Sequence, residues 1–372
     1  MEILIAIIVL SILILVHELG HFIFAKKFGM LVEEFGIGLP PRIWGKRRGS
    51  TIYSINLLPF GGFVRIYGET PLLKEPAETK AGLTAEILDK ATAFYEKPAG
   101  IRFFVLVSGV LMNFMLGVLI LSIILALGVP AYVGSNLKTP LSDIHVEILA
   151  ASEASPAKNA GVLPGDRIVF LESNGEVMEI KKSKEVSDFA EKFKGKEITV
   201  GIRRNSSELS FKILSRKEPP QGEGAMGIAM ADIGTLKYPW WQAPYEALKI
   251  GLKISWLILV ALYDLLKNLF ATGKIPEGVA GPIGIASITG EVFKLGIIRL
   301  LNFTALLSIN LAVLNILPIP ALDGGRVFFV VLEKLIGRPI SRRLEATSHA
   351  LGMAILLTLI MLISIHDIRR LL

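Results

Sequence analysis

Long runs of apolar residues constrain this chain more than any other feature of its sequence. The runs cover residues 3–24, 101–129, 300–322 and 350–365. A helix needs about 20 predominantly apolar residues to cross a hydrocarbon layer about 30 Å thick, and three or four of these runs meet that requirement. The sequence therefore predicts a multi-pass α-helical membrane protein with about four transmembrane helices. It excludes an ordinary soluble enzyme and a disordered chain.

Basic residues indicate which loops face the cytoplasm. Lysine and arginine total 40 against 33 acidic residues in the 372-residue chain, a net charge of +7. In a membrane protein such an excess usually marks cytoplasmic loops, and the basic clusters fall within 26–99 and 334–349. We therefore expect residues 131–299 on the opposite side. Because no basic run is interleaved with aromatic residues, nucleic acid is not an expected partner. The absence of cysteine excludes disulfides and thiolate metal sites.

Two segments outside the apolar runs predict β structure. Residues 51–67 are rich in β-branched and aromatic side chains around Gly61-Gly62, which predicts a membrane-associated β-hairpin. Residues 131–235 alternate in polarity and are numerous enough for one compact soluble domain. Its expected strands are Val146–Ala150, Arg167–Glu172, Glu197–Arg203 and Glu208–Leu214.

A motif that carries chemistry lies in the first apolar run, where residues 17–21 are His-Glu-Leu-Gly-His. Positions i and i+4 share one face of a helix, so both imidazoles can bind one Zn²⁺ while Glu18 lies beside them as general base. The alternative is a pair of interior histidines. We favour the metal, because ionisable side chains are costly inside a bilayer and usually mark function. The motif therefore predicts that His17 and His21 are metal ligands.

A catalytic zinc needs a third protein ligand and an open position for water. We favour Asp323, because two prolines before it and two glycines after it break the helix at membrane depth. Such a break is tolerated only around a buried site. The alternative is a helix-capping aspartate at a membrane exit. At a rise of about 1.5 Å per residue, His17 and Asp323 reach similar depth only if their two helices run in the same direction.

Parallel helices require an even number of crossings between them, and this decides how residues 248–270 are interpreted. Their apolar centre is short, with lysines and tryptophans around it, so we expect an interfacial amphipathic helix rather than a span. This topology divides the chain into a first transmembrane helix with the zinc motif (1–28), a cytoplasmic loop with the hairpin (29–99), a second transmembrane helix (100–130), the soluble domain (131–235), the interfacial helix and its connector (236–299), a third transmembrane helix carrying Asp323 (300–325), a cytoplasmic loop (326–349), and a fourth transmembrane helix with the C-terminal tail (350–372).

Taken together, these motifs resemble the site-2 protease family of intramembrane zinc metalloproteases (peptidase M50) over nearly the whole chain. Within the family, the regulator-of-sigma-E proteases of bacteria are the most similar. His17-Glu18-x-x-His21 matches the zinc and base motif of the family. Asn315-x-x-Pro318-x-Pro320-x-x-Asp323-Gly324 matches its second motif, which supplies the third ligand.

Three further segments extend the resemblance. Leu58-Pro-Phe-Gly-Gly-Phe63, with Gly68-Glu69, is similar to the membrane-associated hairpin of the family, which presents substrate as a strand. Gly281-Pro-Ile-Gly-Ile-Ala286 is similar to a signature before the third span. Ala160-Gly161-Val162-x-x-Gly165-Asp166-x-Ile168 resembles the core of a PDZ domain. The best-known members of the group carry two such domains, whereas 131–235 has room for one.

The resemblance implies a zinc metalloendopeptidase of the bacterial cytoplasmic (inner) membrane. Its active site lies toward the cytoplasm and its PDZ-like α+β domain on the outer side. The implied substrates are single-span membrane proteins, such as an anti-sigma factor, or signal-peptide remnants. The implied cofactor is Zn²⁺ on His17, His21 and Asp323, with Glu18 as base. The implied substrate contacts are Asn310, Asn315, Gly61, Gly62 and Phe63.

Several alternatives stay open. The PDZ-like domain either recruits substrate or filters it by size. A different class of function is a non-catalytic membrane scaffold or a metal-transport component, although a transporter would be expected to carry acidic or histidine pairs on several helices. We interpret His145 as the start of a strand, and His349 and His366 as interfacial residues at the ends of the last span. Asn113 either forms a hydrogen bond between helices or lies close to the site.

Overall fold

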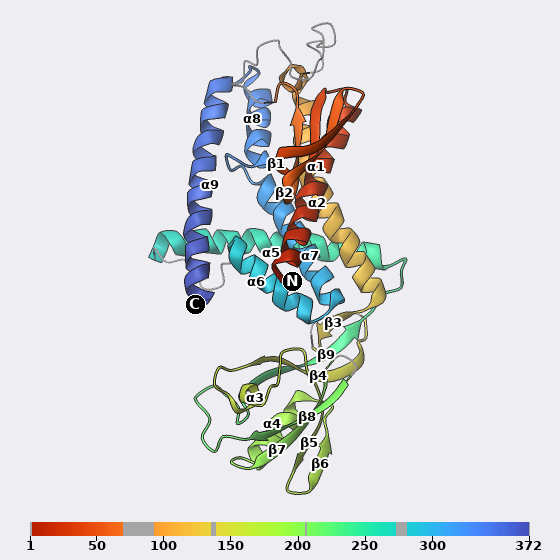
Figure 1. Ribbon diagram of the computed structural model, residues 1–372, viewed down its shortest axis with the longest axis vertical. Coiled ribbons are helices and arrows are strands. Elements are labelled where there is room, and N and C mark those ends of the chain that lie inside the picture. Colours follow the sequence, from red (N-terminus) through yellow and green to blue (C-terminus); the bar gives the residue numbers. More distant parts are fainter. Residues whose placement is uncertain (1, 70–92, 135–138, 205–206, 273–280, 372) are drawn as a thin grey trace. The chain divides into compact units, whose positions relative to one another are not determined.

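The computed structural model describes residues 2–69, 93–134, 139–204, 207–272 and 281–371. The chain forms two compact units, which we call the helical unit (Met1–Ser122 with Pro244–Leu372) and the sheet unit (Ile123–Ala243). Figure 1 labels their elements in chain order.

Most of the helical unit is made of long helices. They are α1 (Glu2–Lys27), α2 (Ala99–Leu127, whose last residues belong to the sheet unit), α5 (Ala243–Thr272), α6 (Pro282–Lys294), α7 (Ile297–Ile316), α8 (Asp323–Ile336) and α9 (Arg342–Leu371), with a 3₁₀ turn, η3 (Phe94–Glu96). Within the described residues, four helices are long and apolar enough to cross a membrane: Ile3–Lys27, Ala99–Leu127, Ile297–Ile316 and Arg342–Arg369. They correspond to the four apolar runs, in agreement with the expected number of spans.

Helix α5 is long but is not among these four candidate spans. Figure 1 shows it running across the direction of α2 and α9. It crosses α2 where Gly251 faces Val118 and Phe114. The interfacial assignment of residues 248–270 stays a prediction.

The third apolar run differs from the expected single helix over 300–325. Helix α7 ends at Ile316, and a new helix, α8, begins at Asp323. Pro318 and Pro320 cause the break, because proline lacks an N–H and clashes with the preceding turn of a helix. Asp323 therefore lies in the first turn of a helix, where the helix dipole favours a carboxylate.

The hairpin is larger than the predicted segment 51–67. Strand β1 (Val32–Arg48) pairs antiparallel with β2 (Thr51–Ile66). The first half of β1 lies between the two halves of β2, since Phe35 pairs with both Tyr53 and Val64. The segment around Gly61-Gly62 is therefore not the turn of a self-contained hairpin. It leads into the edge strand, Gly62–Ile66, of this β1–β2 sheet.

Glycine allows α1 and α2 to pack closely. A Cβ placed on Gly20 of α1 would lie 2.4 Å from the carbonyl oxygen of Ser108 on α2. No side chain fits at that separation, so the residue type sets the distance between the helices. Helix α6 then packs against α1, α7 and α9. The carboxylate of Asp367 on α9 accepts a hydrogen bond from the N–H of Gly284 in its first turn, 2.8 Å away.

An antiparallel sheet with two short helices makes up the sheet unit. The strands are β3 (Val129–Tyr132), β4 (Ser142–Ala151), β5 (Arg167–Ser173), β6 (Glu176–Glu179), β7 (Glu197–Arg204), β8 (Ser207–Leu214) and β9 (Ile228–Leu236), and the helices are α3 (Pro156–Asn159) and α4 (Ser183–Lys192). The strand order is β3-β9-β4-β5-β7-β8, with β6 paired to β5. The four expected strands correspond to β4, β5, β7 and β8. Inward aliphatic residues such as Ile148, Leu171 and Ile202 form its core with Phe189 of α4.

Candidate metal centre

Two helices from opposite ends of the chain bring three potential ligands together. His17 and His21 lie on one face of α1, four residues apart, and both are buried. Asp323 is the first residue of α8. It lies 306 residues after His17 and 302 residues after His21. The carboxylate Oδ2 of Asp323 lies 2.8 Å from Nε2 of His17 and 3.2 Å from Nε2 of His21, and the two Nε2 atoms are 3.2 Å apart. The third ligand predicted from sequence is therefore beside the first two.

This arrangement fits a zinc ion. One potential ligand atom from each of His17, His21 and Asp323 lies within 4.8 Å of the other two. Nitrogen and oxygen ligands of a tetrahedral Zn²⁺, at bond lengths of about 2.0–2.1 Å, are about 3.3 Å apart. The three measured separations are close to that value. Two imidazoles and one carboxylate are also a donor set typical of catalytic zinc.

Glu18 lies beside the cluster and is tied to the hairpin. Its Oε2 accepts a hydrogen bond from the backbone N–H of Val64, 3.1 Å away, on the edge strand of β2. About two turns toward the N-terminus of α1, the Ser11 hydroxyl is joined to the preceding part of β2: it accepts a hydrogen bond from Gly61 N–H and donates one to the Pro59 carbonyl. The hairpin edge therefore runs along α1 past the candidate base.

Two groups on α2, the Val105 carbonyl and the Asn113 side chain, contact the imidazoles and orient them. Nδ1 of His21 lies 2.8 Å from the backbone oxygen of Val105, to which it donates when Nε2 is free to bind a metal. Nδ1 of His17 lies 3.4 Å from Nδ2 of Asn113, and Oδ1 of Asn113 is buried without a hydrogen-bond partner among the described residues. When Nδ1 of His17 is protonated it donates, so the Asn113 amide must turn its oxygen toward Nδ1 to accept. Nε2 of His17 then carries no proton and is free to bind a metal. Asn113 is therefore close to the site, the less favoured of the two sequence interpretations.

A glycine on α2 makes room for the histidines. A Cβ on Gly109 would lie 2.3 Å from Nε2 of His21 and 2.8 Å from Cε1 of His17. Gly109 and Asn113 are four residues apart and so face the same way on the helix. Sequence reasoning missed Gly109. The one sequence feature that could have indicated its role is the i, i+4 spacing of Gly109 and Asn113 within an apolar run.

The loop before Asp323 is equally tight. A Cβ on Gly324 would lie 2.1 Å from the carbonyl oxygen of Leu317, and one on Gly325 would lie 2.5 Å from that of Ile319. The two glycines therefore let α8 begin directly against the end of the preceding loop. That close approach is what carries Asp323 to the histidines.

A cavity of about 420 Å³ opens beside the cluster. Glu18, His21 and Asp323 line one part of it, and the edge strand contributes Phe63 to Ile66. Its other lining residues are Glu69, Ala321, Leu322, Arg326, His349 and Met353. The cavity therefore joins the candidate base and ligands to the strand that the sequence analysis associates with substrate.

Of the predicted substrate contacts, Phe63 lies in the cavity lining. Gly61 and Gly62 are buried just before it, and their backbone lies against Ile14 and Leu15 of α1. Asn310 and Asn315 are partly buried on α7. Neither is among the residues that line this cavity, so their contact with substrate stays a prediction.

His349 and an ion pair are cavity features that sequence reasoning missed. His349 was expected at a membrane interface, but it lines the cavity, because α9 begins at Arg342 rather than at residue 350. The side chain of His366 lies outside the described residues. The Arg326 guanidinium is paired with the Glu69 carboxylate, which joins the first turns of α8 to the end of β2. Hydropathy alone does not indicate which way such side chains face.

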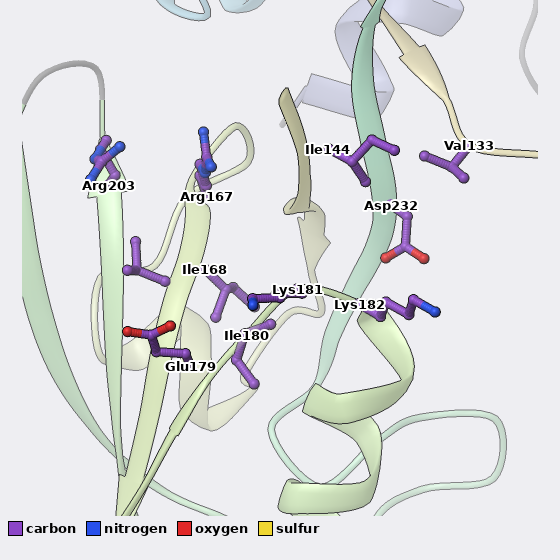
Figure 2. Close-up of a pocket in the computed structure, with 11 residues that line it drawn as sticks. Val133, Ile144, Arg167, Ile168, Glu179, Ile180, Lys181, Lys182, Arg203 and Asp232 are labelled. Carbon is purple, nitrogen blue, oxygen red and sulfur yellow. The ribbon is translucent and has the colours of Figure 1, made fainter. Parts of the chain in front are cut away.

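A second cavity, of about 590 Å³, lies in the sheet unit (Figure 2). Arg167 and Arg203 lie side by side at one end, on β5 and β7. Each already has a carboxylate partner, Asp143 and Glu208 respectively. In the described residues, the cluster on α1 and α8 is the candidate metal site that meets the ligand-distance criterion, and this cavity holds none of its members.

Comparison with known proteins gives an independent result. The profile of peptidase family M50 matches residues 5–359. The zinc metalloprotease RasP of Shouchella clausii is 31% identical over 435 aligned positions, covering 98% of this chain and 97% of RasP. The provisionally named zinc metalloprotease FN1322 of Fusobacterium nucleatum is 33% identical, covering 100% and 99% of the two chains. A similarly named protein of Nostoc, all3971, is 32% identical over 96% of this chain.

Proposed function

The chain belongs to peptidase family M50 and is an intramembrane zinc metalloprotease, and on that premise we propose that His17, His21 and Asp323 hold the Zn²⁺ and Glu18 is the general base. The family resemblance inferred from sequence is thereby confirmed. The observation that carries the residue assignment is the convergence of three ligand atoms within 4.8 Å from positions up to 306 residues apart. Glu18 borders the same cavity.

The proposed reaction is hydrolysis of a peptide bond. A zinc ion held by His17, His21 and Asp323 would supply Lewis acidity for attack of a water on the scissile carbonyl. Glu18 accepts the proton of that water and later delivers it to the leaving amine. The Val64 N–H holds the Glu18 carboxylate at the cavity. His17 and His21 keep their orientation through Asn113 and Val105.

We propose single-span membrane proteins, such as an anti-sigma factor or a signal-peptide remnant, as substrates. A helical segment hides its carbonyls in internal hydrogen bonds, so it must unwind before cleavage. Strand addition to a sheet edge would replace those bonds, and the edge strand Gly62–Ile66 borders the cavity. Asn310 and Asn315 are proposed as further backbone contacts.

The proposed location is the bacterial cytoplasmic membrane. Support comes from the basic clusters in residues 26–99 and 334–349, which favour the cytoplasmic side for both loops. The sheet unit then lies outside, and the metal centre lies toward the cytoplasm. A hydrated path from that side would supply the water that hydrolysis consumes.

For the sheet unit we propose a PDZ-like domain that filters substrates by size. The motif at residues 160–168 supports the PDZ assignment. The test is deletion of residues 135–232, followed by assay of an intact and an extracytoplasmically truncated substrate. Gained cleavage of the intact form would support the filter. Lost cleavage of both forms would support recruitment instead.

The site assignment is tested with two substitutions in purified, reconstituted protein. Glu18→Gln should retain zinc, measured by metal analysis, and abolish cleavage of a labelled single-span substrate. Asp323→Ala should lower zinc content. A matched control is Glu246→Gln on α5, an acidic residue outside the cavity lining, which should leave both readouts unchanged. Unchanged turnover in Glu18→Gln, or full zinc occupancy in Asp323→Ala, would refute the corresponding role.

A further inference from the structure

His349 of α9 carries an N–H donor of defined position. Its Nδ1 accepts a hydrogen bond from the backbone N–H of Ala321, 3.0 Å away. A ring nitrogen that accepts carries no proton, so the ring is neutral and its proton is on Nε2. His349 lines the cavity that also contains Glu18, His21 and Asp323.

That donor has no acceptor in the described part of the chain. Nε2 of His349 is buried and makes no hydrogen bond there. Two of its neighbours are apolar: the Phe329 ring centroid is 5.9 Å from that of His349, and Met353 follows one turn later on α9. The charged side chains of Asp323 and Arg326 line the same cavity, but neither makes a hydrogen bond to Nε2. Buried polar groups are almost always paired, and an exception at an active site calls for a functional explanation.

The loop that carries Asp323 fixes this tautomer. Ala321, whose N–H bonds Nδ1, has a φ of +87°. A residue with a Cβ rarely adopts that conformation, and strained backbone is concentrated at functional sites. The loop therefore sets both the position of Asp323 and the protonation of His349.

We propose that Nε2–H of His349 donates a hydrogen bond to the carbonyl oxygen of the scissile peptide as negative charge develops on it. The proposal rests on the zinc site proposed above. Charge that develops in the transition state is stabilised best by donors already fixed in position before the reaction. His349 is such a donor, and the substrate supplies the acceptor that the described structure lacks. The proton stays on Nε2 throughout, so His349 is neither a ligand nor a base.

Two substitutions separate this role from a structural one. Asn places an amide oxygen where His has Nδ1, so His349→Asn keeps the acceptor for Ala321 N–H and removes the Nε2 donor. Gln reaches the Nε2 position, so His349→Gln keeps a donor there and loses the Nδ1 acceptor. Both variants are compared with the wild-type full chain in zinc content, kcat, KM, and affinity for a phosphonamidate peptide that mimics the tetrahedral transition state.

We expect His349→Asn to keep its zinc and its KM, and to lose about 10²–10³-fold in kcat. Its affinity for the phosphonamidate should fall by a similar factor. His349→Gln should remain well above His349→Asn in both readouts. Wild-type kcat and phosphonamidate affinity in His349→Asn would overturn the proposal, as would loss of zinc from that variant. Neither result would contradict the proposed zinc site. That proposal would instead be refuted if wild-type activity survived complete chelation of zinc.

Discussion

At the scale of single residues, α2 shapes the proposed metal centre, although none of the three proposed ligands lies on it. Gly109 leaves space for both imidazoles, and Asn113 and the Val105 carbonyl orient them. Mutation of a residue that orients a metal ligand in this way typically lowers metal affinity or activity about 10- to 100-fold. The chemistry of the His-Glu-x-x-His motif therefore depends on a helix that lies about 90 residues away in sequence.

Gly109→Ala should remove zinc binding. Alanine is the better helix former by about 1 kcal/mol, so any loss must come from its Cβ, which would lie 2.3 Å from Nε2 of His21. Metal analysis of the purified protein measures the effect. Gly100→Ala on the same helix is the matched control, because a Cβ there meets nothing within 4 Å. Equal zinc content in the two variants would show that the close approach is not maintained.

At the scale of elements, the hairpin and α8 are joined beside the cavity. Arg326 lies one turn after Asp323, and its partner Glu69 follows the end of β2. The pair is only partly exposed, with side-chain exposures of 32% and 19%. A pair of this kind holds α8, which bears the proposed ligand Asp323, beside the strand that we propose presents substrate.

Breaking this pair should cost stability and activity. Glu69→Gln leaves the Arg326 charge without its partner. The expected loss lies between the ~1 kcal/mol of exposed pairs and the ~3–5 kcal/mol of buried ones. Thermal unfolding of Glu69→Gln, Arg326→Met and the double variant forms a double-mutant cycle. We expect the double variant to be no less stable than Glu69→Gln alone. Strictly additive effects would mean that the two side chains are not coupled.

The sheet unit should become less stable as pH rises. The carboxylate of Glu147 lies beside the His145 imidazole and raises the pKa of His145 above its ordinary value, although burial of the imidazole opposes this shift. A raised folded-state pKa stabilises the folded unit below the unfolded value of about 6.5, and this contribution is lost as pH rises through the folded-state pKa. The urea midpoint of the unit, measured by protease protection of β4 and β9, should fall between about pH 6 and pH 8. His145→Gln should flatten that slope. An identical slope in this variant would assign the effect to another group.

At the scale of the whole molecule, the sequence predicted what is local and missed what depends on tertiary contacts. Helical spacing alone brought His17, Glu18 and His21 to one site, and apolar run length located the spans. Asp323, the proposed third ligand, was found from the proline and glycine break in its apolar run and was supported by the family resemblance, because periodicity alone does not say which distant loop returns to α1. The region around β1 was interpreted as a basic loop because its strand character depends on pairing with both halves of β2. For a related reason, the sequence did not show that His349 lines the cavity, since α9 begins about two turns before its apolar run.

Removing zinc should loosen the whole helical unit. The proposed ligands join α1 to α8, so the metal cross-links distant parts of the folded chain. Zinc at about 1,000 times its Kd would stabilise the folded state by about 4 kcal/mol. Chelation should therefore lower the thermal unfolding temperature of wild type and of Glu18→Gln by similar amounts. It should lower that of Asp323→Ala much less, and an equal shift in that variant would exclude Asp323 from the cross-link.

The distance between the two halves of this centre also matters while the protein is being made. A ribosome synthesises the segment with His17, Glu18 and His21 first. It adds Asp323 only after 322 of the 372 residues have been joined. An incomplete product, cut short by damage or a premature stop codon, would enter the membrane with two thirds of its ligands and no means of cleaving its neighbours. The proposed site is therefore complete only after residue 323 has been added.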